Sequence, residues 1–267
     1  MRWKTRAIAM VVIVVLMAVS FVIPVSAISD GEVAAPSAIL MEPNTGKILY
    51  EKNANELRPC ASITKVMTLL LVMEAIDSGK ISLDDQVTAS AHAASMGGSD
   101  IWLKEGETMS VNDLIKATVI MSANDAAVVL AEHVYGTEDE FVKQMNIRAK
   151  QLGMNDTTFK NCNGLDEDGH LTTAHDVALM SAELIKHEKI FDYTLTWMDY
   201  VRDGETQLVN TNKLIRSYKG ITGLKTGTTS QAGSCISATA KRDNLSLVAV
   251  VLGCSTTDER FTSASTL

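Results

Sequence analysis

Cysteine, histidine and proline are scarce in this chain, with four, five and four residues among 267. The histidines form no His-Glu-x-x-His pair and the cysteine spacing fits no zinc motif, so the sequence predicts no metal centre. A chain of this length can build its core without disulfides, and free thiols at Cys60, Cys162, Cys235 and Cys254 are therefore expected. Cys235 and Cys254 lie on neighbouring predicted strands, however, and could pair in an oxidising compartment.

Positive charge is also in deficit, because 24 lysines and arginines face 32 aspartates and glutamates. This balance argues against nucleic acid or an anionic membrane surface as the main partner. Long apolar runs are confined to the N-terminus, where a basic segment, the apolar stretch 8–22 and the small residues 25–27 follow one another. This order predicts a signal peptide over 1–27 and an exported mature chain from 28. An uncleaved anchor is the alternative, although the apolar stretch is short for a membrane span.

Strand patterns stand at both ends of the remaining chain and helical patterns in its middle. Strands are expected at 38–41, 47–50, 234–240 and 245–252, with a further strand-like stretch around Lys225. Helices are expected at 62–78, 114–121, 124–135, 138–152 and 173–187, several of them ending at a glycine. The first of these is apolar on most sides and should be buried. The sequence thus predicts an α+β fold, in which an antiparallel sheet is flanked by helices and carries an inserted helical lobe.

Three short motifs, in order along the chain, suggest nucleophilic chemistry. They are Ser62-Ile63-Thr64-Lys65, Ser122-Ala123-Asn124 and Lys225-Thr226-Gly227. A serine hydroxyl is a weak nucleophile and needs a base, and residues three apart on a helix share a face. Lys65 could therefore take the proton of Ser62, provided that burial lowers its pKa. Ser62 could instead be an ordinary helix cap, and Ser122 and Asn124 could mark a helix start, which is compatible with a functional role.

This set of motifs resembles the active site of penicillin-binding proteins and serine β-lactamases. The chain as a whole is similar to the low-molecular-mass penicillin-binding proteins, the serine-type D-alanyl-D-alanine carboxypeptidases of peptidase family S11. Four segments carry that likeness: 37–52, 89–98, 161–176 and 208–233. The resemblance implies a β-lactamase/transpeptidase-like fold for residues 28–267. It also implies a cleft between the sheet and the helical lobe, and no cofactor.

The resemblance also implies a role for each motif residue. Ser62 would be the nucleophile and Lys65 its base, Ser122 would relay a proton to the leaving amine, and Asn124 would hold Lys65 and a substrate amide. Lys225, Thr226 and Thr228 would bind the substrate carboxylate. Gly227 would let the substrate approach the strand closely. The backbone N–H groups of Ser62 and Thr228 would form the oxyanion hole, and His170 could orient a loop near the cleft.

The activity implied is hydrolysis of the terminal D-Ala from D-Ala-D-Ala peptidoglycan stem peptides through a serine acyl-enzyme, in cell-wall maturation. β-Lactam antibiotics would be inhibitors. Many members of the family continue into a β-rich domain and a membrane-anchoring helix. The present sequence reaches Leu267 just after a last helix is expected to begin near Asp258. That helix is therefore expected to be cut short, with no second domain, and peripheral membrane association would need a further segment.

Three alternatives remain open from the sequence. A serine β-lactamase shares all three motifs, but the Glu-x-x-Leu-Asn stretch of class A enzymes is missing between the second and third motifs. A non-catalytic penicillin sensor would bind through Ser62 without turning over a peptide. A zinc peptidase would cleave the same substrate but would be sensitive to chelators.

Overall fold

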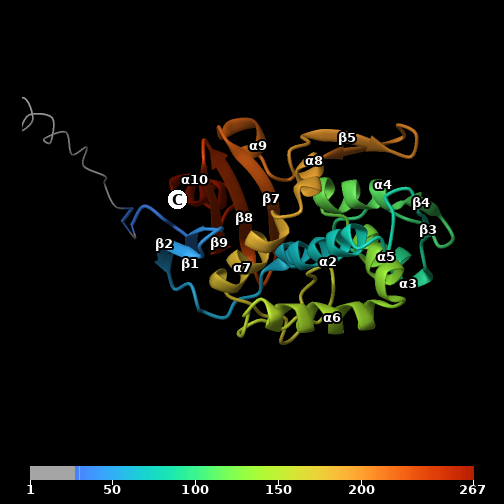
Figure 1. The fold of residues 1–267 in the computed structure, drawn as a ribbon, viewed down its shortest axis with the longest axis horizontal. Coiled ribbons are helices and arrows are strands. Elements are labelled where there is room, and N and C mark those ends of the chain that lie inside the picture. Colours follow the sequence, from blue (N-terminus) through green and yellow to red (C-terminus); the bar gives the residue numbers. More distant parts are fainter. Residues whose placement is uncertain (1–27, 30) are drawn as a thin grey trace, which may run out of the picture.

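A five-stranded antiparallel sheet is built from both ends of the chain (Figure 1). The computed structural model describes residues 28, 29 and 31–267, and the signal peptide expected over 1–27 lies outside the described residues. The strand order is β2-β1-β9-β8-β7. The strands are β1 (Ser37–Glu42), β2 (Lys47–Lys52), β7 (Ile221–Thr229), β8 (Gly233–Arg242) and β9 (Leu245–Cys254). The four strands expected from alternation are confirmed, and β7, which carries Lys225, is an edge strand.

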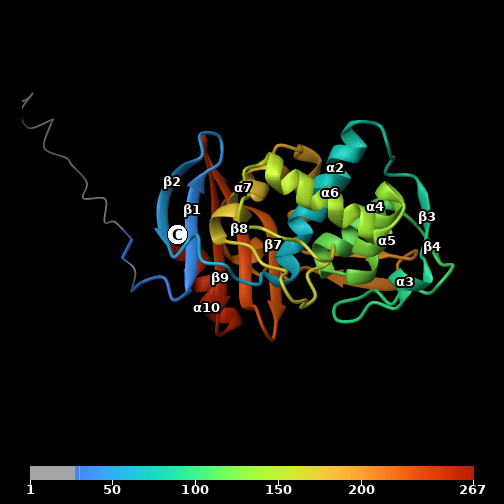
Figure 2. The same cartoon turned by 90° about the horizontal axis from the view of Figure 1, so that it is seen from below.

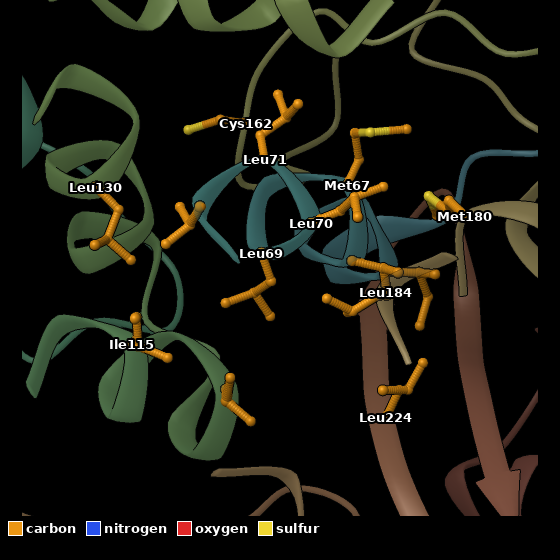
Figure 3. Close-up of a cluster of buried hydrophobic side chains, with 14 of the residues drawn as sticks. Met67, Leu69, Leu70, Leu71, Ile115, Leu130, Cys162, Met180, Leu184 and Leu224 are labelled. Atoms are coloured by element: carbon orange, nitrogen blue, oxygen red, sulfur yellow. The ribbon is translucent and has the colours of Figure 1, made fainter. Parts of the chain in front are cut away.

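The helical part of the molecule surrounds one buried helix, α2 (Lys65–Asp77). Its side chains point in all directions into the core, as Figure 3 shows for Met67, Leu69 and Leu70. Helix α7 (Ala174–Leu184) packs on β1 and β9 and also on α2, so it joins the sheet to the helices. Helices α4 (Val111–Lys116), α5 (Asn124–Tyr135) and α6 (Glu138–Gln151) complete this part. Figure 2 shows helices α2, α4, α5 and α6 lying to one side of the five-stranded sheet.

The opposite face of the sheet is covered by the last helix, α10 (Thr257–Thr266). Alternate residues of a strand point to opposite faces. On β1, Ile39 therefore faces the main core, whereas Ala38 belongs to a second cluster with Phe261 of α10. The helix starts with a capping box in which Thr256 and Glu259 satisfy each other's backbone N–H groups.

Several short elements were not expected from the sequence. They are η1 (Ala61–Thr64), β3 (Gln86–Thr88), α3 (Ala91–Ala94), β4 (Thr108–Ser110), η2 (Ala117–Met121), η3 (Glu188–Ile190), α8 (Phe191–Thr194), β5 (Met198–Val201), β6 (Thr206–Val209) and α9 (Leu214–Ser217). Two of them correct expected helices. The helix expected from residue 62 begins instead as the 3₁₀ turn η1, and the helix expected over 114–121 is α4 followed by the π-turn η2.

All four cysteines are buried and unpaired, so Cys235 and Cys254 do not form the disulfide that their neighbouring strands allowed. Burial raises the pKa of each thiol, which keeps it protonated and unreactive. Within the part of the chain that the structure describes, no helix combines the length and apolar character needed to cross a bilayer.

Candidate active site

Ser62 lies in the turn η1, which is pressed against the edge strand β7. A side chain at Gly227 would place its Cβ 2.8 Å from Cys60 O and 2.9 Å from Ser62 N. Position 227 therefore requires a glycine, because residues 60–62 of the chain lie too close to leave room for a side chain. The close approach of the substrate expected at Gly227 stays a prediction beside this contact. Ala61 has a left-handed φ of 49°, which bends the chain just before Ser62.

A second glycine, Gly164, lies against the same turn. Gly164 has φ of +88°, and a Cβ there would lie 2.0 Å from Ala61 O. Both Gly164 and Gly227 therefore fix the position of η1, because neither can accept a side chain without moving the turn.

We expect Gly164→Ala to be strongly destabilising. Gly153→Ala is the matched control, because Gly153 has a similar φ of +79° but nothing within 4 Å of an added Cβ. The control should lose about 1 kcal/mol of unfolding free energy from backbone strain, and Gly164→Ala about 3 kcal/mol more from the clash. Thermal unfolding of both variants measures the difference, and equal melting temperatures would show that η1 can move freely.

Lys65 is completely buried beside Ser62, at the first turn of α2. Its Nζ lies 3.0 Å from Ser62 Oγ, 2.6 Å from Asn124 Oδ1 and 2.6 Å from Asn163 O. The amide of Asn124 is oriented by its Nδ2, which donates to Gly97 O at 2.6 Å. Two of the three neighbours of Nζ are thus fixed acceptors, and only the Ser62 hydroxyl can also donate.

Burial lowers the pKa of Lys65 to about 7, against smaller opposing effects of Cys162, Asp100 and Asp125. A buried ammonium loses its hydration, which favours the neutral amine. With its protons directed at the oxygens of Asn124 and Asn163, a neutral Lys65 presents its lone pair to Ser62. This geometry is that of a serine nucleophile with its general base.

The second motif crosses a strained turn between η2 and α5. Ser122 has a left-handed φ of 66°, and its buried Oγ has no hydrogen-bond partner among the described residues. Asn124 is the first residue of α5, and the cap position belongs to Ala123 with no side-chain cap bond. Asn124 therefore lies at a helix start, as the alternative interpretation expected, although neither Asn124 nor Ser122 is the N-cap of α5. Strain and an unsatisfied hydroxyl at one residue are features that cluster at functional sites.

The third motif places a second buried lysine near Lys65. Lys225 is buried, with its Nζ donating to Thr226 O at 3.0 Å. Burial, followed by the nearby charges of Lys65 and Arg260, holds the pKa of Lys225 well below its usual range. Thr226 Oγ1 donates to Thr211 Oγ1 at 2.7 Å. Thr228 lies two residues further along β7.

Arg260 of α10 was not identified from the sequence as part of the site. Its Nη1 donates to two atoms of β7, Gly227 O at 3.2 Å and Thr228 Oγ1 at 3.0 Å. Its Nε is buried without a partner among the described residues. Arg260 shares a helical face with Ser263 and Ala264, so a charged residue on a buried face was the available signal.

His170 is linked to the turn η1 through Thr64. Lys160 N donates to His170 Nδ1 at 3.2 Å, so the ring proton sits on Nε2, which is 2.8 Å from Thr64 Oγ1. Thr64 in turn donates to Ala61 O at 2.9 Å. Burial lowers the pKa of His170 to about 4, and the ring therefore stays neutral near pH 7. This chain of bonds agrees with the expectation that His170 orients a loop near the cleft.

The structure brings Ser62, Lys65 and Asn124 into direct contact and places Gly227 against Ser62 N. Lys225 is close enough to Lys65 for the two charges to influence each other. Ser122 lies two residues before Asn124, and Thr226 and Thr228 flank Gly227 on β7; among the described residues, their side chains make no hydrogen bond to Ser62 or Lys65. A serine with a buried amine at hydrogen-bond distance, near the donors Lys225 and Arg260, is a geometry suited to acyl transfer from a substrate that bears a carboxylate.

Comparisons with known proteins agree on the family. A family model described as D-alanyl-D-alanine carboxypeptidase, peptidase family S11, matches residues 24–256. The D-alanyl-D-alanine carboxypeptidase DacF of Bacillus subtilis is 52% identical over 229 residues, which is 85% of this chain and 59% of that protein. DacC of Escherichia coli is 38% identical over 256 residues, covering 91% of this chain and 64% of the relative.

Solved structures show the same fold. Penicillin-binding protein D2 from Listeria monocytogenes, in its ampicillin-bound form, matches with a TM-score of 0.82 and 35% identity. That match covers 90% of this chain and 98% of the other. Penicillin-binding protein 6B from Escherichia coli matches with a TM-score of 0.84 and 34% identity, over 91% and 78% of the two chains.

The fold is therefore that of the penicillin-binding proteins, an α+β fold of the β-lactamase/transpeptidase type, as the sequence predicted. The chain belongs to the D-alanyl-D-alanine carboxypeptidase family, peptidase family S11. It spans about three fifths of the length of the curated relatives it matches.

Proposed function

We propose that this chain removes the terminal D-alanine from peptidoglycan stem peptides that end in D-Ala-D-Ala, in cell-wall maturation. The observation that carries the proposal is the buried Lys65 amine, which lies 3.0 Å from Ser62 Oγ and has a pKa of about 7. Family membership supports the same activity. The site would need no cofactor, because the chain supplies both nucleophile and base.

The proposed reaction has two steps. Lys65 accepts the hydroxyl proton as Ser62 Oγ attacks the carbonyl carbon of the penultimate D-alanine. The C–N bond breaks, and the proton passes through the unpartnered hydroxyl of Ser122 to the leaving amine of the terminal D-alanine. Water then hydrolyses the ester on Ser62 and restores the serine. The N–H groups of Ser62 and Thr228 are proposed to hold the oxyanion, each contributing roughly 3 kcal/mol.

The buried side chains of Lys225 and Arg260 would favour a substrate with a free carboxylate, which would stabilise their charged forms. Lys225 and Arg260 donate to backbone carbonyls and to Thr228, and Arg260 Nε remains unpartnered within the described chain. A carboxylate held by Lys225, Thr226 and Thr228 would compensate this charge. This requirement favours a carboxypeptidase, which acts on the last residue of a peptide, over an endopeptidase.

Arg260→Met should weaken this recognition. We expect the catalytic efficiency for a D-Ala-D-Ala peptide to fall roughly tenfold to a hundredfold, because a charged donor beside Thr228 is lost. Arg216→Met is the matched control, since the exposed Arg216 carries the same charge, stacks on Trp197 and is not one of the motif residues. Steady-state kinetics with both variants test this prediction. Equal losses of catalytic efficiency would contradict a role of Arg260 in substrate recognition.

Penicillins are proposed to acylate the same serine and to leave slowly. The similar Listeria protein was solved in an ampicillin-bound form and in a cefotaxime-bound form. A serine β-lactamase is not favoured, because the similar proteins DacF, DacC and DacD are carboxypeptidases. We also propose that the protein is exported and acts at the cell envelope, where its substrate lies. Any peripheral membrane association would depend on a segment beyond these residues.

Release of D-alanine tests the proposed function. Residues 28–267 should release D-alanine from a tripeptide ending in D-Ala-D-Ala but not from the same peptide ending in D-Ala-L-Ala. Activity should persist in a chelator, which distinguishes the serine mechanism from a zinc peptidase. Penicillin labelling of folded protein without any D-alanine release would instead indicate a sensor domain.

A further inference from the structure

Trp102 combines two unfavourable features in one residue. Its side chain is 74% exposed, the largest value among the large apolar residues that the structure describes. Its backbone is also left-handed, with φ of 54°, a conformation that bulky residues rarely adopt. A single exposed tryptophan is unremarkable by itself, but a strained backbone that turns the side chain outward favours a role in binding.

The residues on either side of Trp102 are firmly held. The buried carboxylate of Asp125 accepts the backbone N–H of Ile101 at 3.2 Å and that of Leu103 at 2.9 Å. Arg202 of the β5–β6 connection donates from Nη1 to Ile101 O at 2.9 Å. Ile101 and Leu103 are themselves buried, so the tryptophan between them is displayed on a fixed backbone.

This segment is attached to the active site. Asn124 N donates to Ser99 O at 2.7 Å, and Asn124 Nδ2 donates to Gly97 O. Trp102 is three residues beyond Ser99, and three residues of extended chain span at most roughly 10 Å. Trp102 therefore stands near the rim of the site that contains Ser62 and Lys65.

An open hollow of about 660 Å³ adjoins Trp102, with Arg202 and Glu107 among its walls. Arg202 Nε and Glu107 Oε1 form an ion pair of 2.6 Å, which fixes two planar polar groups beside the indole ring. The exposed Lys104 and Glu105 complete the polar side of the hollow. An aromatic surface with a few oriented polar groups is a common design of small-molecule sites.

We propose that this hollow binds the sugar to which the stem peptide is attached. A pyranose ring has one face of C–H groups that can stack on an indole, and hydroxyls at its edge that suit the paired groups of Arg202 and Glu107. A peptide of four or five residues spans at most roughly 17 Å, so its sugar must lie near the rim of the site. The inference rests on the proposed function and specifies that glycan-linked peptide is the preferred substrate.

Two substrates test the inference. One is a free pentapeptide ending in D-Ala-D-Ala, and the other is the same pentapeptide carried on a disaccharide of N-acetylglucosamine and N-acetylmuramic acid. Trp102→Ala should lower kcat/KM about tenfold for the glycopeptide and less than twofold for the free peptide. Trp102→Phe, which keeps an aromatic face, should retain most of the activity on both. An equal loss on both substrates, or no loss on either, would overturn the inference.

A binding measurement keeps the inference testable without turnover. Trp102 and Trp197 are the two tryptophans after residue 27, so Trp197→Phe leaves Trp102 as the sole reporter in residues 28–267. The disaccharide without peptide should change the emission of this variant in a saturable way. An unchanged emission would contradict sugar binding. If the sugar binds but the unaltered protein releases no D-alanine from either substrate, the proposed function fails and the sugar site stands.

Discussion

Replacing Ser62 by alanine is expected to abolish covalent labelling by a fluorescent penicillin and to reduce D-alanine release roughly ten-thousandfold. Among the described residues, the hydroxyl is the only group hydrogen-bonded to Lys65 Nζ that can both lose a proton and form an ester, because the other two contacts are carbonyl oxygens of Asn124 and Asn163. No neighbouring oxygen can take its place.

The fold should survive this change, because only one oxygen is removed from a turn fixed by Gly164 and Gly227. Ser78→Ala is the matched control, since Ser78 is an exposed serine at the other end of α2. It should label like the unaltered protein. Retention of labelling in folded Ser62→Ala protein would mean that another residue is acylated.

The rate of acylation should depend strongly on pH, through the protonation state of Lys65. The amine acts as a base only when neutral, and burial lowers its pKa to about 7. Below that pH the acylation rate should fall about tenfold per unit, and above it the rate should level off. The charged or titratable groups around Lys65 are Asp100, Asp125, Cys162 and Lys225.

Stopped-flow acylation by penicillin between pH 5 and 9 measures this profile. His170 does not account for a change near pH 7, because burial holds its pKa at about 4. Lys65→Met should lose at least a thousandfold in rate and should show no step near pH 7. A flat profile for the unaltered protein would mean that Lys65 is not the base.

Much of the sheet could be predicted from the sequence, because the apolar stretches 234–240 and 245–252 flank a polar turn at 241–244, which is the pattern of a buried hairpin. Helices α5, α6 and α7 were expected near their observed bounds, with stops such as Gly136. The short pairs β3–β4 and β5–β6 were missed, since strands of three or four residues have too few alternating positions to be recognised.

The eight motif residues could be found from the sequence because the motifs are local. Their geometry could not, since it depends on contacts between distant segments. The sequence around Ser62 does not indicate that Gly164 and Gly227 lie against its turn, or that the carbonyl of Asn163 orients Lys65. Arg260 likewise joins the site only because α10 packs behind β7 and β8. These contacts turn a weak Ser-x-x-Lys pattern into a hydrogen-bonded pair of serine and buried lysine, for which we propose the roles of nucleophile and base.

The most direct test of the account is the intact mass of residues 28–267 after incubation with penicillin, followed by digestion and mapping of the modified peptide. The account predicts one penicillin per chain, attached to Ser62. An adduct on a different residue, or no adduct on well-folded protein, would contradict the assignment of Ser62 and Lys65 as nucleophile and base.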